Sequence, residues 1–246
     1  MTKPVDLYFW PTPNGFKVSI MLEECGLAYN LVPVNISTGD QFKPAFLKIS
    51  PNNKMPALVD HDGPDKKPIS IFESGAILLY LARKTGKFLP QDERGRVQAE
   101  QWLFWQMASL GPMLGQTHHF LHYAPEQVPY AINRYTNETK RLYGVLGRQL
   151  QGRDFIAGDY SIADMACYPW INSWEKQGVQ LADFPNVKTW FERTGARAAV
   201  QKGMAAGAEL RKDAADMKDP KVQALLFNNK TANTNEAHPL PARPAR

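Results

Sequence analysis

The chain has 246 residues, of which 43% are hydrophobic and 22% charged. This composition is that of an ordinary globular protein and excludes a fibrous or disordered one, and the length allows one large domain or two modest ones. The net charge of +5 is too small, and the basic residues are too spread out, for a nucleic-acid-binding surface, which needs a stripe of basic residues. The sequence therefore predicts no nucleic-acid partner.

The chain has two cysteines, Cys25 and Cys167, and they form no CxxC pair. Two cysteines cannot build a disulfide framework, which favours a reducing compartment. No run approaches the ~18 apolar residues of a membrane span, and Pro4 and Asp6 come too early for a signal peptide. We therefore expect a cytoplasmic protein without membrane contact.

Over the first part of the chain, residues 1–87, short β-rich runs alternate with helical patterns. Strands are predicted at 5–10, 31–36, 57–60 and 69–72, and helices at 17–26, 42–50 and 74–86. A hairpin can join the last two strands, so the sheet should be mixed. This order predicts a thioredoxin-like α/β domain.

After a polar linker at 87–96, the chain shows only long helical patterns. They predict an all-α helical bundle domain over 95–210, with helices at 97–110, 113–124, 131–150, 161–178 and 184–197 and a break at Gly111–Pro112. Residues 219–246 have the composition of a tail, apart from the apolar segment Val222–Phe227. We expect that segment to dock on the helical domain or on a second subunit, because its apolar side chains, if exposed together, would form a surface patch that promotes association.

A Pro-rich loop, PTPNG at 11–15, lies between the first predicted strand and the first predicted helix. Ligands of open α/β sheets bind where the next helix begins, because its first backbone N–H groups are unpaired and carry a partial positive charge. A bound thiolate would be stabilised there, and Thr12 and Asn14 could donate to it from a hydroxyl and an amide. The structural alternative is a turn followed by a helix N-cap.

Two further segments could contact the same ligand. Met55–Pro56 leads into a strand, and a cis peptide bond would turn the backbone of Met55 toward a ligand, although most X–Pro bonds are trans. Glu73 and Ser74 stand where a strand enters a helix, so that Ser74 and the free N–H groups could bind a carboxylate while Glu73 accepts from an ammonium. The alternative for this pair is Ser74 as an N-cap followed by a helix.

Other conspicuous residues favour a structural reading. The S-x-x-D pattern of Ser161 and Asp164 predicts a capping box. His118, His119 and His122 have poor spacing for metal ligands, and no metal site is expected. Cys25 lies two turns beyond the loop with no basic residue placed to lower its pKa, so both cysteines are predicted to be structural. The aromatic residues of the second half are assigned to the bundle core, or to a substrate wall where they face the sheet: Trp102, Trp105, Tyr168, Trp170 and Trp174.

Several motifs together resemble the nu-class bacterial glutathione transferases over roughly residues 5–200. The segments that carry the likeness are FWPTPNGFKVSIMLEE, FESGAILLYLARKTG, GPMLGQTHHF and YSIADMACYPW. The C-terminal tail matches the family poorly. The resemblance implies a homodimer with glutathione as cosubstrate, in which a bound glutathione thiolate, rather than a protein cysteine, performs the chemistry.

The resemblance also implies roles for individual residues. Thr12 and Asn14 would contact the sulfur as the catalytic pair, Met55 would pair with the cysteinyl backbone, and Glu73 with Ser74 would hold the γ-glutamyl end. The remaining polar groups of the peptide would be held by Gln41, Lys54 and Arg134. The second-substrate cleft would be formed by Phe16, Met113, His119 and Tyr168.

The expected activity is glutathione-dependent disulfide-bond reduction. Lowering a thiol pKa from roughly 9 to roughly 6.5 needs about 3 kcal/mol, which two or three hydrogen bonds to the anion can supply. One alternative within the resemblance is a lyase that cleaves aryl ethers with glutathione thiolate. Another is a binding or regulatory protein that keeps the fold without catalysis.

Overall fold

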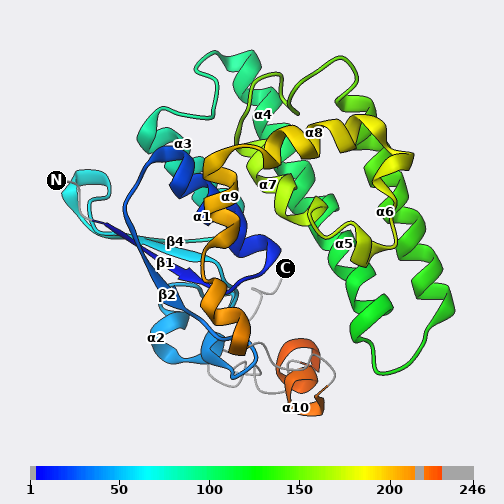
Figure 1. Cartoon of the computed structure of the whole chain (residues 1–246). Coiled ribbons are helices and arrows are strands. Elements are labelled where there is room, and N and C mark those ends of the chain that lie inside the picture. The colour runs from blue at the N-terminus through cyan, green and yellow to red at the C-terminus, as the bar shows by residue number, and fades with distance from the viewer. Residues whose placement is uncertain (1–3, 214–218, 229–246) are drawn as a thin grey trace, which may run out of the picture.

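A four-stranded sheet lies beside a larger group of helices in the computed structural model, which describes residues 4–213 and 219–228 (Figure 1). The strands are β1 (Val5–Phe9), β2 (Tyr29–Pro33), β3 (Ala57–Asp60) and β4 (Ile69–Phe72), in the order β2-β1-β3-β4. β2 is parallel to β1, whereas β3 is antiparallel to both β1 and β4. The mixed sheet and the thioredoxin-like class are therefore confirmed.

Three helices accompany the sheet: α1 (Pro13–Cys25), α2 (Pro44–Leu47) and α3 (Ser74–Thr85). α1 begins four residues before the predicted start, because extended Thr12 caps it and Pro13 occupies its first turn. It ends at Gly26, whose φ of 68° is the left-handed conformation that glycine adopts readily. α1 packs against α3, α7 and α9, so it forms the junction between the sheet and the helices.

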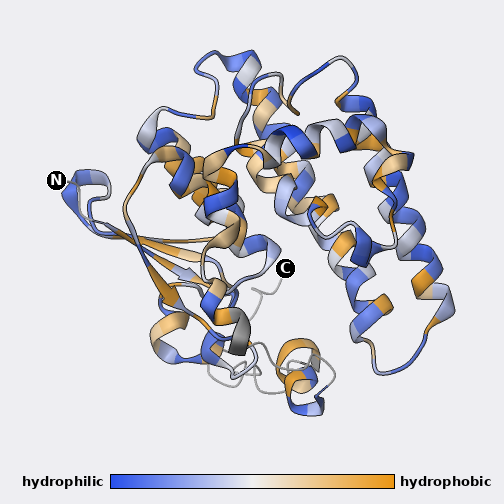
Figure 2. Cartoon of the chain, viewed as in Figure 1, coloured by the Kyte–Doolittle hydropathy of each residue, from blue (hydrophilic) through white to orange (hydrophobic). Residues whose placement is uncertain are grey.

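The second part of the chain is helical, as predicted. Its helices are α4 (Glu93–Trp105), α5 (Gly111–His118), α6 (Pro129–Gln149), α7 (Ile162–Ile171), α8 (Pro185–Gly195), α9 (Ala198–Ala205) and α10 (Pro220–Gln223). Figure 2 shows hydrophobic residues gathered on the strands and on α1 and α7, where the two parts meet. All ten residues of α7 are buried.

The predicted break at Gly111–Pro112 is wrong. A π-helical segment, Gln106–Leu110, joins α4 directly to α5, and Gly111 keeps helical dihedral angles. The proline is tolerated because it stands in the first turn of α5, directly after this wider segment, where its missing N–H group costs little. The segment turns Gln106 and Met107 toward α1 and α3, which they reach by hydrogen bonds.

The capping box at the start of α7 is confirmed. Asp164 is fully buried and accepts hydrogen bonds from the backbone N–H groups of Ser161 and Ile156, both at 3.0 Å, and from Trp190 Nε1 at 2.8 Å. One carboxylate thus satisfies donors from the N-cap of α7, from α8 and from the preceding loop. This explains why an acidic residue is retained in the interior.

The apolar segment of the tail docks as expected. Val222 is buried, and the side-chain amide of Gln223 donates to the carbonyl of Tyr123 at 2.6 Å. The ring of Phe227 stacks on Tyr123 and meets His119 edge-on, with the latter centroids 4.6 Å apart. The segment therefore lies against the π-helical segment His119–Tyr123 that follows α5, close to the mouth of the candidate site.

Candidate functional site

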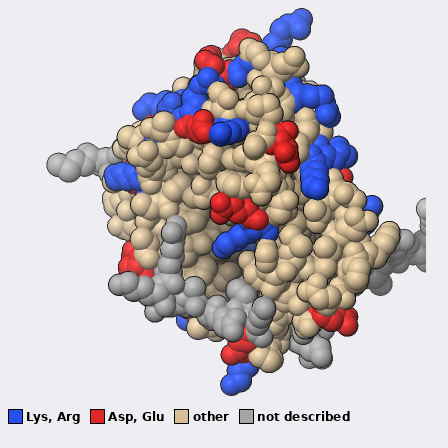
Figure 3. Space-filling model, turned by 45° about the vertical axis from the view of Figure 1, so that its right-hand side comes forward, with Lys and Arg blue, Asp and Glu red and all other residues tan. Residues whose placement is uncertain are grey.

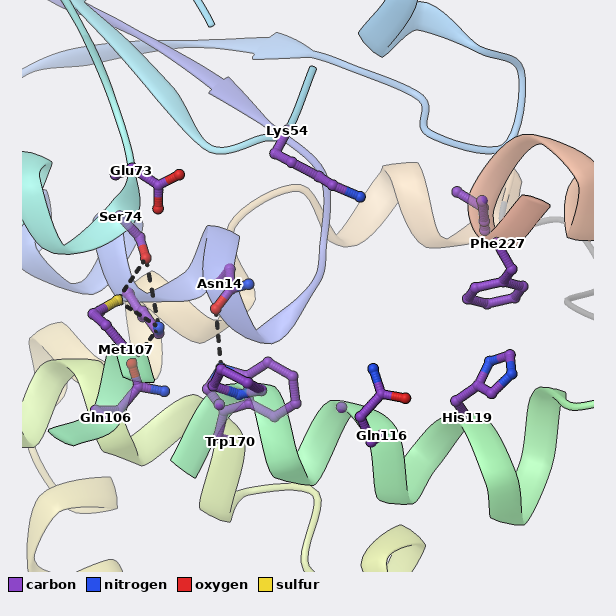
Figure 4. Close-up of a pocket in the computed structure, with 15 residues that line it drawn as sticks. Asn14, Lys54, Glu73, Ser74, Gln106, Met107, Gln116, His119, Trp170 and Phe227 are labelled. Atoms are coloured by element: carbon purple, nitrogen blue, oxygen red, sulfur yellow. Dashed lines mark hydrogen bonds between the residues drawn. The ribbon is translucent and has the colours of Figure 1, made fainter. Parts of the chain in front are cut away.

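A pocket of about 650 Å³ opens between the sheet domain and α5 (Figure 4). Its size is that of a small-molecule site. Asn14, Glu73 and Ser74 line one side of it, and Gln116 and His119 line the other. A second pocket of about 350 Å³ adjoins it and shares Asn14 as a lining residue. Figure 3 shows Lys and Arg interspersed with Asp and Glu over one face of the molecule.

Thr12 lies at the N-terminus of α1 and lines the second pocket. Its hydroxyl accepts from the N–H of Gly15 and donates to Met55 Sδ, both at 3.4 Å. The structural reading of Thr12 as an N-cap is therefore correct, and the same hydroxyl faces a pocket. Gly15 is required next to it, because a Cβ there would lie only 2.4 Å from the carbonyl oxygen of Trp10.

Asn14 projects into the first pocket from the first turn of α1. Its Oδ1 accepts a hydrogen bond of 3.0 Å from Nε1 of the buried Trp170 on α7 (Figure 4). Because Nε1 is only a donor, this bond fixes the amide with its NH₂ group, the donating end, away from the indole. Asn14 is thereby oriented to donate to a ligand.

Glu73 and Ser74 begin α3. Glu73 has a φ of 69° and occupies the N-cap position, but no side chain caps the helix, and Ser74 is the first helical residue. The reading of Ser74 as an N-cap is therefore wrong: its hydroxyl instead contacts Met107 Sδ at 3.6 Å. The first N–H groups of α3 thus stand beside the pocket without a side-chain acceptor, an arrangement that suits an anion.

Three predicted glutathione-binding residues lie together in the second pocket: Gln41, Lys54 and Met55. The Met55–Pro56 bond is cis, as predicted. Gln41 is buried, and its Oε1 has no hydrogen-bond partner although its Nε2 donates to the carbonyl of Ile36 at 3.0 Å. A buried acceptor without a partner, next to a pocket, fits a ligand N–H group.

The remaining predicted residues lie in different places: some line a pocket, and others are in the core or on the surface. His119 lines the first pocket, and Phe16 lines a third pocket that shares Thr12 with the second. Tyr168 is instead buried and stacks on Phe191, and Met113 packs against the core. Arg134 is exposed on α6 and lines none of the pockets described here.

Sequence reasoning missed two residues of the pocket floor, Lys17 and Gln106. Lys17 is 1% exposed, and its Nζ donates to Gln106 Oε1 at 2.6 Å. Burial lowers the pKa of this amine to about 7. No local pattern distinguishes Lys17 from a surface lysine, and the only signal was its place one turn after Asn14 on the same helix.

The cysteines are buried and unpaired. Burial raises the pKa of both the Cys25 and the Cys167 thiols, which disfavours a reactive thiolate. Among the described residues no group of His, Cys, Asp and Glu side chains could hold a metal ion, and none of the described helices has both the length and the hydrophobicity of a membrane span. Other groups around the two pockets suit a peptide ligand with an anionic group and a thiolate. They are the donors of Thr12 and Asn14, the open start of α3 and the unpartnered Oε1 of Gln41.

Comparison with known proteins agrees with this description. Residues 3–83 match the glutathione S-transferase N-terminal domain, and residues 114–198 match the C-terminal domain. The chain is 55% identical over 202 residues to the disulfide-bond oxidoreductase YfcG of Escherichia coli, covering 81% of this chain and 94% of that protein. The chain therefore belongs to the glutathione transferase family.

Two solved structures are similar as well. A glutathione transferase from Burkholderia graminis with two glutathione molecules bound per subunit has a TM-score of 0.79 and 47% identity, covering 83% of this chain and 88% of that one. One from Pseudomonas putida with one glutathione disulfide per subunit has a TM-score of 0.79 and 45% identity, covering 83% and 92%.

Proposed function

We propose that the protein is a glutathione-dependent disulfide-bond reductase. The observation that carries the proposal is the pair of pockets at the start of α1, where the Thr12 hydroxyl and the oriented Asn14 amide adjoin the open N-terminus of α3. This combination offers donors for a thiolate on one helix and an anion site on the next. The similar Escherichia coli protein YfcG, which is named a disulfide-bond oxidoreductase, points to the same activity, and the similar Burkholderia graminis transferase binds two glutathione molecules per subunit.

The binding roles follow the chemistry of each side chain. Glu73 and Ser74 would hold the γ-glutamyl end, with the carboxylate at the start of α3 and the ammonium at Glu73. Met55 would pair with the cysteinyl backbone, while Gln41 would accept from a peptide N–H and Lys54 would bind the glycine carboxylate. Arg134 stays a prediction without support from the pocket.

The reaction requires two glutathiones. The first thiolate attacks one sulfur of a disulfide RSSR, forming a mixed disulfide and releasing RS⁻, which takes a proton. The second thiolate attacks the glutathione sulfur of the mixed disulfide and releases the other RS⁻. The balance is two glutathione thiols oxidised to one disulfide and one RSSR reduced to two thiols. The adjoining pockets of about 650 and 350 Å³ give room for both peptides.

Aryl ether cleavage is a second candidate, because aromatic rings stand at the mouth of the first pocket. Phe227 and His119 line it, and Tyr123 stacks on Phe227. Such a wall could receive an aromatic ring beside the thiolate. Phe16 would extend the apolar surface in the third pocket, which Thr12 also lines.

Assembly as a homodimer in the cytoplasm completes the proposal. Large apolar side chains are exposed on β4 and α4, namely Phe72, Val97 and Phe104, the last with 60% of its surface exposed. A second copy of the chain would cover them. The two unpaired cysteines suit a reducing compartment. Light scattering of wild type and Phe104→Glu tests the assembly, since the variant should shift toward monomer.

The activity is tested by turnover of hydroxyethyl disulfide with glutathione, alongside an aryl ether substrate. We expect disulfide reduction as the main activity and binding of two glutathione molecules per subunit in calorimetry. One copy per subunit, together with no disulfide reduction, would replace the proposal with a single-site conjugating transferase. Tight binding without turnover of either substrate would favour a regulatory protein.

A further inference from the structure

Lys17 is a buried amine at the floor of the first pocket that the proposed mechanism does not use. Besides Gln106 Oε1, its Nζ contacts Ser74 Oγ at 3.5 Å and Met107 Sδ at 3.7 Å. Within the described residues, no carboxylate forms an ion pair with it. A buried ammonium without a carboxylate partner is costly, so the apo site is short of one negative charge.

Gln106 shows a complementary deficiency on the same floor. It is fully buried and lines the pocket, and its Nε2 has no hydrogen-bond partner. Its Oε1 is already committed to Lys17. The floor therefore offers a cation and an unsatisfied N–H donor, and both point to an acceptor supplied by a ligand.

We propose that Lys17 is the counter-charge of the γ-glutamyl α-carboxylate and couples binding of the peptide to uptake of a proton. The inference rests on the proposed glutathione site. A carboxylate bound at the start of α3 would be separated from Lys17 Nζ by the Ser74 hydroxyl group. The ammonium donates to Ser74 Oγ, so the hydroxyl hydrogen is free to turn from Met107 Sδ to the carboxylate. Lys17 thus acts as a positioning residue.

The direction of the coupling follows from the charges around Nζ. Desolvation lowers the pKa of Lys17, and the nearby Cys167 on α7 and the carboxylate of Glu73 oppose this effect only in part. Two further basic side chains, those of Lys54 and His119, line the same pocket as Lys17. A ligand carboxylate within about 6 Å favours the ammonium by roughly one to two pKa units, so the bound protein holds a proton that part of the free protein lacks.

The probe is S-methylglutathione, whose thioether removes the titration of the thiol. We expect its Kd to rise roughly tenfold from pH 6 to pH 8.5 in wild type, because the proton that favours binding is lost as the pH passes 7. Calorimetry at pH 7.5 in buffers of different ionisation enthalpy should give uptake of about half a proton per peptide. Lys17→Met should abolish the uptake and flatten the profile to less than twofold.

Two controls separate this coupling from a general loss of binding. Lys54→Met removes a different lysine of the pocket, and His119→Asn removes an imidazole, and both should keep the wild-type slope even where binding weakens. The S-methyl derivative of 4-aminobutanoyl-cysteinylglycine lacks only the γ-glutamyl α-carboxylate, so wild type should bind it weakly and without proton uptake.

The outcomes are distinguishable. Wild-type binding that is tight, independent of pH and free of proton uptake overturns the role of Lys17 and leaves the glutathione site in place. An undiminished slope in Lys17→Met does the same. Absence of any S-methylglutathione binding overturns the proposed function itself. Because proton uptake is measured on the wild-type protein, the result does not depend on the variant folding.

Discussion

Trp170 and Asn14 are joined by a hydrogen bond of 3.0 Å that links the helical domain to the candidate catalytic loop. Trp170 belongs to α7, the most buried helix of the second domain, whereas Asn14 belongs to the first turn of α1. The indole can only donate, so it selects one of the two orientations of the Asn14 amide. The helical domain thereby sets the direction in which the first domain presents its donor.

This bond makes Trp170 a positioning residue. Asn14→Ala should lower turnover more than tenfold, because a donor to the thiolate is lost, and Trp170→Phe should lower it several-fold by freeing the amide. The double variant should be no slower than Asn14→Ala, since both changes act through one amide. Steady-state kinetics of the four proteins checks this. Additive losses would mean that Trp170 acts independently of Asn14.

Thr12 offers a second donor to the sulfur. Thr12→Ala should lower turnover more than tenfold while the fold is kept, whereas Thr12→Ser retains the hydroxyl and most of the activity. The matched pair also controls for the N-cap, because serine caps helices as well as threonine does. Unchanged rates in Thr12→Ala/Asn14→Ala would refute the assignment of this loop as the thiolate site.

Features with a local cause were predictable from the sequence. The strands at 57–60 and 69–72 and the capping box of Ser161 and Asp164 follow from residue pattern and side-chain chemistry over a few positions. The loop containing Thr12 and Asn14 was found because a strand followed by a helix start is an anion site in many folds.

Features that depend on packing between distant segments were not predictable. Lys17 and Gln106 are 89 positions apart, and only the approach of α1 to the π-helical segment buries them together. The sequence predicts Trp170 either in the bundle core or in a wall that faces the sheet, and it is buried and lines both pockets. Its bond to Asn14, however, spans 156 positions. Gly111–Pro112 predicted a break because local propensity does not anticipate a π-helical segment.

The cysteines provide a test of the mechanism. Cys25→Ala/Cys167→Ala should retain most of the disulfide reductase activity, because both thiols are buried and burial disfavours their thiolates. The variant should be less stable, by about 1–3 kcal/mol, since small cavities replace both sulfurs. A tenfold or greater loss of turnover in a folded variant would restore a protein-cysteine mechanism.

The docked tail should affect the second substrate. Part of the wall of the first and second pockets is formed by Leu225, Leu226 and Phe227. Ending the chain after residue 218 removes this part of the wall. We expect KM for an aromatic or bulky disulfide to rise several-fold and stability to fall. A chain ending after residue 228 retains the wall and is the matched control. Identical kinetics and stability in both truncations would show that the docked segment has no role.

The last prediction concerns the stability of the unliganded protein. Lys17 has a pKa of about 7 when folded, well below the ordinary value of 10.5. Between these values the unfolded chain binds a proton that the folded chain lacks, so stability rises with pH in this window. Below pH 7 both states are protonated, and the full cost of the buried charge is present.

Lys17→Met removes this dependence. From pH 7 to pH 9 the free energy of unfolding of wild type should gain about 2 kcal/mol relative to the variant, because nearly one proton at 1.36 kcal/mol per pH unit is involved. Urea unfolding of both proteins without ligand measures the difference, in which the other titrating groups cancel. Saturating S-methylglutathione should shrink the gain, since a bound carboxylate restores the proton to Lys17. Parallel pH profiles of the two unliganded proteins would mean that Lys17 keeps its ordinary pKa in the folded state, and that the floor of the pocket is open to water.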